Sequence, residues 1–181
     1  MIAGPPRVLV TAATRHGSTG EIAVALARAI HDPRQEIEAV FFPVEQRPDP
    51  TPFDAVVLGS AVYAGRWLDA ARDFATAHAV ALRARPLWLF SSGPIGAPPF
   101  PADEPYDVAP LIQTLHPRGH HVFPGRLDKG LLSFGERAMV TAMRAPLGDF
   151  RDWDAVSTWA QQIAGDVLAG RASNNPHRVG R

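Results

Sequence analysis

The chain has 181 residues, of which 46% are hydrophobic and 20% charged, which is typical of one globular domain around one core. Its formal net charge is zero, which argues against a nucleic-acid binder, because such domains are normally strongly basic. It contains no cysteine, so disulfides, thiolate metal sites and cysteine nucleophiles are excluded, and redox chemistry would have to come from a bound cofactor. No stretch approaches the ~20 apolar residues of a membrane span, and we expect a cytoplasmic protein.

The first part of the chain alternates predicted strands with predicted helices. Residues 7–13 form a short apolar run that is typical of a strand buried on both faces. Residues 18–31 carry apolar side chains at helical spacing and predict a helix. Residues 37–44 are rich in β-branched and aromatic side chains and predict a second strand. Prolines then break regular structure until residue 53, so we expect the usual second helix to be short or missing.

The middle of the chain continues the alternation. Residues 53–60 predict the third strand, residues 67–85 a long helix, and residues 86–92 the fourth strand. A segment rich in proline and glycine follows over 93–105. Strands that alternate with helices across short connections indicate a doubly wound parallel sheet rather than a sandwich or a bundle.

The last part of the chain completes this sheet. A helix is predicted over 107–115, a fifth, edge strand over 120–123, and a final helix from Trp153 onward. We therefore predict an α/β protein with a five-stranded, doubly wound parallel sheet and an insertion between the fifth strand and the last helix. Residues 1–170 are expected to form one domain, and residues 171–181 a flexible tail.

In such a sheet, ligands bind beyond the carboxyl ends of the strands, so the loops there are the candidate sites. The first loop joins the first strand to the first helix and combines hydroxyl groups, a glycine and the free N–H groups of a helix start. That combination favours a phosphate monoester. The candidate residues are Thr14, Arg15, His16, Gly17, Ser18 and Thr19. It is neither a Walker A sequence nor a GxGxxG loop, and no metal site is predicted.

A second interpretation of the first loop is purely structural. Ser18 would cap the first helix, and Glu21, three residues later, would complete a capping box. The residues alone leave both interpretations open.

Two further loops lie at the same predicted edge of the sheet. The loop after the third strand contains aromatic and small residues that allow a planar ligand to approach the backbone, and the loop after the fourth strand is rich in glycine and proline. Packing of the aromatic residues and a simple connection are the structural alternatives. The candidate residues are Ala61, Val62, Tyr63, Ala64 and Gly65 in one loop, and Ser92, Gly93, Pro94 and Ile95 in the other.

The order of these loops carries a resemblance that covers nearly the whole chain. The matching segments are Thr14-Arg15-His16-Gly17-Ser18-Thr19 with Glu21-Ile22-Ala23, then Gly59-Ser60-Ala61, Phe90-Ser91, Gly125-Arg126-Leu127 and Asp152-Trp153. They resemble the flavodoxin-like FMN-binding proteins, and most closely those of the menaquinone-dependent protoporphyrinogen oxidase type. The resemblance implies that the first loop holds the FMN phosphate and that the other two flank the isoalloxazine ring. Ala13 departs from the pattern, because a serine or threonine often stands there.

The resemblance implies an FMN-dependent oxidoreductase. An exposed insertion over 117–151 is both basic and partly apolar, which favours an acidic planar substrate or a peripheral contact of residues 126–146 with the inner face of an anionic membrane. A helix that covers the sheet edge with solvated arginines is the structural alternative. The expected partners are a redox protein, a quinone or a small planar substrate. Two other functions stay open, namely a non-catalytic electron-transfer flavodoxin and an interaction module without cofactor.

Overall fold

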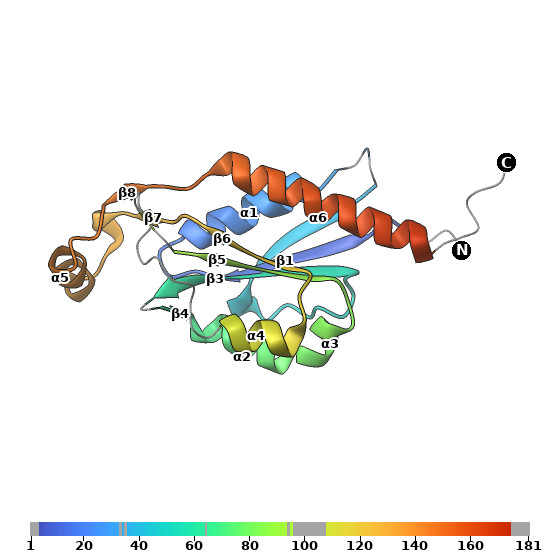
Figure 1. The fold of residues 1–181 in the computed structure, drawn as a ribbon, viewed down its shortest axis with the longest axis horizontal. Helices are drawn as coiled ribbons and strands as arrows, with labels where there is room; N and C mark the ends of the chain where they lie inside the picture. The colour runs from blue at the N-terminus through green and yellow to red at the C-terminus, as the bar shows by residue number, and fades with distance from the viewer. Residues whose placement is uncertain are drawn as a thin grey trace.

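A parallel sheet of five strands forms the centre of the protein (Figure 1). The computed structural model describes residues 4–32, 34, 36–63, 65–93, 95 and 108–174. In spatial order the strands are β2 (Glu38–Pro43), β1 (Arg7–Ala13), β3 (Ala55–Tyr63), β5 (Leu87–Ser92) and β6 (Gly119–Phe123). A short strand, β4 (Arg66–Trp67), pairs antiparallel with the end of β3. The predicted α/β fold with five parallel strands is confirmed.

Helices cover both faces of the sheet (Figure 1). On one face lie α1 (Ser18–Ile30) and α6 (Trp153–Asn174), and on the other lie α2 (Asp69–Ala77), α3 (Ala79–Arg83) and α4 (Val108–Leu115). The single helix predicted over 67–85 is therefore wrong in detail. Trp67 belongs to β4, and the helix is interrupted at His78, whose φ of −108° and ψ of 16° are not helical. Between β2 and β3 there is only the 3-10 turn η1 (Val44–Gln46), as the prolines predicted.

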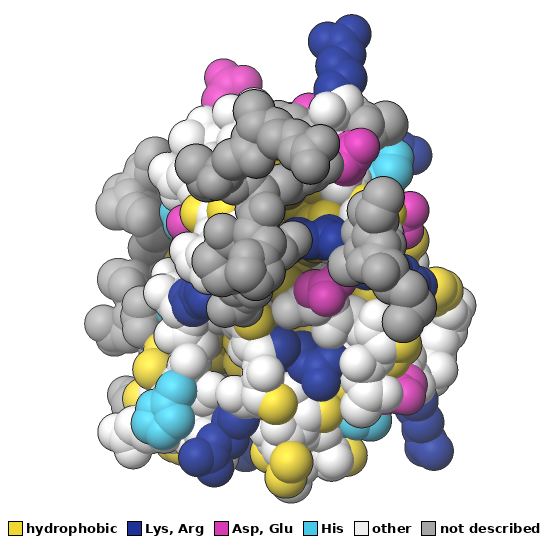
Figure 2. All heavy atoms as spheres, turned by 90° about the vertical axis from the view of Figure 1, so that its right-hand side faces the viewer, with side chains coloured by type: hydrophobic (Ala, Val, Ile, Leu, Met, Phe, Trp, Pro, Cys, Tyr) yellow, Lys and Arg dark blue, Asp and Glu magenta, His cyan; other side chains and the backbone are white. Residues whose placement is uncertain are grey.

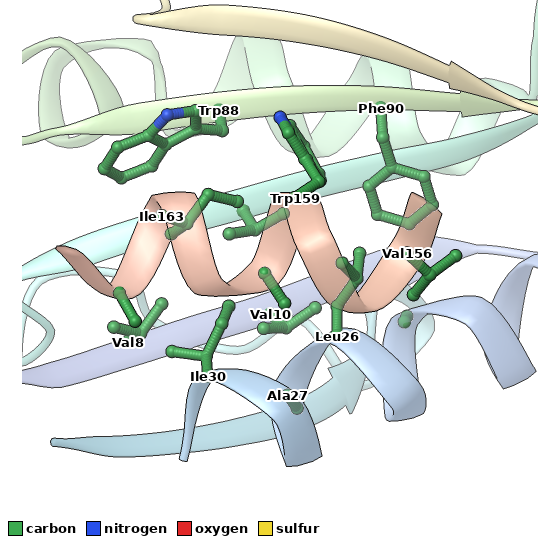
Figure 3. Close-up of a cluster of buried hydrophobic side chains, with 14 of the residues drawn as sticks. Val8, Val10, Leu26, Ala27, Ile30, Trp88, Phe90, Val156, Trp159 and Ile163 are labelled. Carbon is green, nitrogen blue, oxygen red and sulfur yellow. The ribbon is translucent and has the colours of Figure 1, made fainter. Parts of the chain in front are cut away.

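The larger core cluster lies between the sheet and the helices α1 and α6. Figure 3 shows Val8 and Val10 of β1 facing Leu26 and Ile30 of α1, with Trp159 of α6 beside them. A second cluster lies on the opposite face, under α2, α3 and α4. Both faces of β1 are thus buried, and its apolar side chains alternate between the two clusters, as do those of β3 and β5.

The strand order places the connections of β1 and β3 on opposite faces. β1 pairs with β2 on one side and with β3 on the other, and Ala13 lies opposite Ser60 at the carboxyl ends. From these ends α1 leaves toward one face of the sheet and α2 toward the other (Figure 1). A crevice opens where the connections diverge, and this is the usual ligand position in an open α/β sheet.

The predicted insertion after β6 lies beyond these carboxyl ends, at the left of Figure 1. It consists of β7 (Arg126–Leu127), η2 (Lys129–Leu131), α5 (Phe134–Ala142) and β8 (Gly148–Asp149). Since β7 and β8 pair antiparallel, the insertion leaves the sheet and returns at one point. Figure 2 shows the opposite end of the molecule, where basic and acidic side chains lie scattered among uncharged ones.

Two sequence predictions concern the chain beyond this fold. α6 continues to Asn174, so the helix includes the first residues of the segment predicted as a tail, and residues 175–181 lie outside the described ones. The division into one domain and a tail stays a prediction. In the part of the chain that the structure describes, every helix is too short or too polar to cross a bilayer.

The close packing of β3 against β5 predicts one large effect of a small substitution. A Cβ atom added at Gly59 would lie 2.1 Å from two ring atoms of Phe90, which is itself fully buried. Gly59→Ala should lower the free energy of unfolding by about 1–3 kcal/mol. The control is Gly165→Ala on α6, where a Cβ meets open space and should stabilise the helix by about 0.5–1 kcal/mol. Urea unfolding curves measure both, and equal midpoints would contradict this account of the packing.

Candidate functional site

The loop between β1 and α1 ends on a helix without a side-chain cap. Gly17 is the N-cap residue, and its φ of +86° lies in the left-handed region that favours glycine. Its own N–H donates to the Thr14 hydroxyl at 3.1 Å, which closes the turn. No side chain accepts a hydrogen bond at the N-cap position. The first N–H groups of α1 therefore carry a partial positive charge with no side-chain cap to satisfy them.

The capping interpretation of Ser18 and Glu21 is wrong, because both side chains reach the insertion instead. The Ser18 hydroxyl accepts a hydrogen bond from the Arg126 N–H at 3.2 Å. The Glu21 carboxylate pairs with Arg126 at 3.1 Å and with Arg151 at 2.5 Å, and these contacts lower the pKa of Glu21, with Arg151 the main cause. The anion-binding interpretation is the one that the local geometry favours.

Arg151 anchors the end of the insertion to α1. Its side chain is only 4% exposed, and besides Glu21 it pairs with Asp149 at 2.6 Å. The guanidinium also lies 4.6 Å from the centre of the Trp153 ring. The return from β8 into α6 is thereby fixed beside the first turn of α1.

The three predicted loops line one hollow of about 160 Å³ at the carboxyl ends of the strands. Of the predicted site residues, Gly17 in the loop before α1 and Gly65 in the β3–β4 turn do not line the hollow. Ala64 and Pro94 lie outside the described residues. The predicted residues in the wall are Thr14, Arg15, His16, Ser18, Thr19, Ala61, Val62, Tyr63, Ser92, Gly93 and Ile95. Their predicted contacts with a cofactor stay a prediction.

The loops after β3 and β5 touch at Gly93. A Cβ atom there would lie 2.8 Å from the Cβ of Val62, so only glycine permits this approach. Below them, the Trp67 indole N–H donates to the buried Ser91 hydroxyl at 2.8 Å, and this hydroxyl lies 2.9 Å from Nε2 of His120. The indole can only donate, so the serine oxygen accepts from Trp67 and shares its second hydrogen bond with the His120 ring. Ser91 therefore fixes the strand ends and is too buried to act as a nucleophile.

Part of the wall comes from the insertion, for which the sequence predicted a substrate or membrane contact but named no residue that lines the same hollow as the three loops. Met139, Val140, Met143 and Ala145 line the hollow, together with Gly125, Arg126 and Leu127. The spacing of Met139 and Met143, four residues apart, places both on one side of α5. That spacing was the available signal, but it does not reveal what the side faces. Elsewhere on the insertion Phe134 is 91% exposed, and the membrane contact predicted for residues 126–146 stays a prediction.

A cluster of charged and aromatic side chains joins the insertion to the first loop. The Glu136 carboxylate lies 3.0 Å from Nε of Arg15 and 3.2 Å from Nε2 of His16. Hydrogen bonds from Ser133, and then those from His16 and the charge of Arg15, lower the pKa of Glu136 to about 2. The Arg15 guanidinium also lies 5.1 Å from the centre of the Tyr63 ring. Burial, and secondly the Glu136 charge, raise the pKa of Tyr63.

The residues that line the site suit the binding of a ligand with both polar and apolar parts. The hollow combines an anion-attracting helix start, hydroxyl groups and apolar side chains. The described residues contain no group of three or more His, Asp or Glu side chains that would hold a metal ion. Such a site suits a ligand with a phosphate end and an apolar body.

Comparison with known proteins gives a family match and a set of similar folds. The family model described as "Flavodoxin domain" matches residues 9–154. A search of curated protein sequences found no match.

Several solved structures share the fold at low sequence identity. The rubredoxin oxygen:oxidoreductase of Desulfovibrio gigas superposes with a TM-score of 0.61 at 13% identity over 93% of this chain, which spans only 38% of that protein. A flavodoxin from the domain Archaea gives a TM-score of 0.59 at 12% identity, covering 89% of this chain and 98% of that one. Oxidised flavodoxin 1 from Bacillus cereus gives 0.51 at 17%, covering 90% and 97%.

The family model covers the strands, the first helix and the insertion in one continuous match, and the strand order of the sheet agrees with the solved flavodoxins. This chain belongs to the flavodoxin family.

Proposed function

We propose that this protein binds FMN and acts as an FMN-dependent oxidoreductase of the protoporphyrinogen-oxidase-like type. The observation that carries the FMN proposal is the first turn of α1, which lacks a side-chain cap and opens into the hollow beside three hydroxyl groups. A phosphate is the ligand that such a helix start attracts. Flavodoxin is also the family to which the chain belongs.

The residues around the hollow fit FMN at its phosphate end. The side chains of Thr14, Ser18 and Thr19 lie at the helix start, where Arg15 adds a positive charge and His16 adds a hydrogen-bonding ring. The apolar residues Ala61, Val62 and Ile95 are the ones that would face the ring. Bound FMN would supply the electron-transfer chemistry, while the chain would orient the flavin and limit the access of water.

The insertion favours an enzyme over a plain electron carrier. A carrier needs only an exposed flavin edge, whereas here Leu127, Met139 and Met143 add an apolar wall to the site. Arg126 lies in the same wall and suits a largely apolar substrate that carries carboxylates. Protoporphyrinogen is an apolar macrocycle with carboxylate side chains, and the loop motifs resemble those of the proteins that oxidise it.

The first test is the cofactor itself. The purified protein should be yellow, or should bind added FMN and quench its fluorescence. Riboflavin, which lacks the phosphate, should bind at least tenfold more weakly, because the helix start then has no anion to hold. A colourless protein that does not bind FMN would exclude both redox functions, and equal affinities for the two flavins would exclude the placement of the phosphate.

The second test concerns one hydroxyl group in the loop. Thr19→Ala should weaken FMN binding by about 1–3 kcal/mol, because a charge-assisted hydrogen bond to the phosphate is lost. Thr76→Ala is the matched control, since its hydroxyl bonds only to a carbonyl within α2. Fluorescence titration gives both dissociation constants. An unchanged constant for Thr19→Ala would contradict the proposed site.

The third test separates the enzyme from the carrier. Under anaerobic conditions, protoporphyrinogen should reduce the FMN-loaded protein, and a quinone should then reoxidise it, both at rates above those of free FMN. Stopped-flow absorbance follows both steps. Rates no higher than those of free FMN would leave the electron carrier as the supported function.

A further inference from the structure

Arg15 and His16 of the first loop already contact an anion that belongs to the protein. Oε1 of Glu136, from the insertion, lies 3.0 Å from Nε of Arg15 and 3.2 Å from Nε2 of His16. The side chain of Glu136 is only 17% exposed. With a pKa of about 2, this carboxylate is ionised at neutral pH. An internal carboxylate and an incoming phosphate would thus compete for the same two side chains.

The same carboxylate also begins the helix that covers the hollow. Its Oε2 accepts the Ser133 N–H at 2.8 Å, and the Ser133 hydroxyl accepts the Glu136 N–H, which together form the capping box of α5. Met139, Val140 and Met143 of this helix line the hollow. Glu136 therefore connects the first turn of α5 directly to the phosphate loop.

Within the part of the chain that the structure describes, little else holds α5 in this position. None of its residues is buried, and Met139 and Met143 are 59% and 53% exposed although they face the hollow. Another bond near the helix, from Nε of Arg137 to the Leu132 carbonyl at 2.9 Å, stays within the insertion. Because a helix on a protein is stabilised chiefly by its buried apolar face, α5 is the weakest part of the wall.

The size of the hollow gives an independent reason for movement. Its volume is about 160 Å³, whereas sites for small ligands usually measure ~300–1,000 Å³. The walls formed by β-strand ends and α1 are rigid, since they continue into the buried core. Among the described walls, α5 is the one that can move outward and enlarge the hollow for a ligand as large as FMN.

We propose that α5 is a displaceable cover over this site and that Glu136 is its latch. The inference rests on the proposed binding of FMN. An incoming phosphate exchanges with the Glu136 carboxylate on Arg15 and His16, because two anions side by side in one hollow repel each other. Released from the loop, α5 moves outward and makes room for the flavin ring.

Nitroxide labels measure this movement directly. The chain has no native cysteine, so a labelled pair can be introduced at Phe134→Cys on α5 and Val80→Cys on α3, two positions that are 91% and 87% exposed. Pulsed electron resonance then gives the distribution of distances between the labels. FMN should shift or broaden this distribution in the protein that carries Glu136.

Glu136→Gln removes the charge that forms the latch and keeps the capping box of α5. The Gln side chain retains an oxygen for the Ser133 N–H, so the capping box persists while the charge facing Arg15 is lost. Without any FMN, this variant should show the label distances that the protein with Glu136 shows only when FMN is bound. It should also bind FMN at least threefold faster than the protein with Glu136. Asp166→Asn, which removes one negative charge from the exposed side of α6, is the matched control and should change neither result.

The outcomes distinguish the two proposals. If FMN does not bind, the proposed function fails. The cover is still tested in that case, because the label distances of Glu136→Gln and of the protein with Glu136 can be compared without FMN. The latch is wrong if Glu136→Gln leaves the distances unchanged. It is equally wrong if FMN binds and the label distances in the protein with Glu136 stay the same, or if their distribution narrows around the distance measured without FMN.

Discussion

The partial positive charge at the start of α1 is the constraint on which the rest of the site depends. Gly17 supplies the left-handed turn and offers no side chain as a cap, while Thr14 satisfies the glycine N–H from within the loop. The buried strand β1 fixes where this turn stands relative to the end of β3. An anion at this point restores the hydrogen bonding of the helix start, which no loop side chain provides.

The insertion is joined to this region by charges of both signs. Arg126 and Arg151 of the insertion region pair with Glu21 on α1, while Glu136 of the insertion pairs with Arg15 and His16 of the loop. The first attachment includes the buried guanidinium of Arg151, which pairs with both Glu21 and Asp149. Arg15 is half exposed, and pairs of this kind contribute only about 0–1 kcal/mol, so the second attachment can open. One side of the insertion thus serves as a hinge and the other as a latch.

The sequence predicted the sheet well because its strands are continuous apolar runs between breaking residues. It failed where a contact between distant residues decides the structure. Ser18 and Glu21 have the spacing of a capping box, but the Ser18 hydroxyl accepts a hydrogen bond from the backbone N–H of Arg126, 108 residues later. The pairing of Glu136 with His16 spans 120 residues and leaves no local pattern. The interruption at His78 was hidden because the apolar spacing continues on either side of it.

The central claim is that the first turn of α1 receives the phosphate of FMN, and amide chemical shifts test it most directly. In a titration of the ¹⁵N-labelled protein with FMN, the amide signals of Ser18, Thr19 and Gly20 should show the largest shifts, and riboflavin should leave them nearly unchanged. If FMN binds while these three signals stay in place, the phosphate lies elsewhere and the account is wrong.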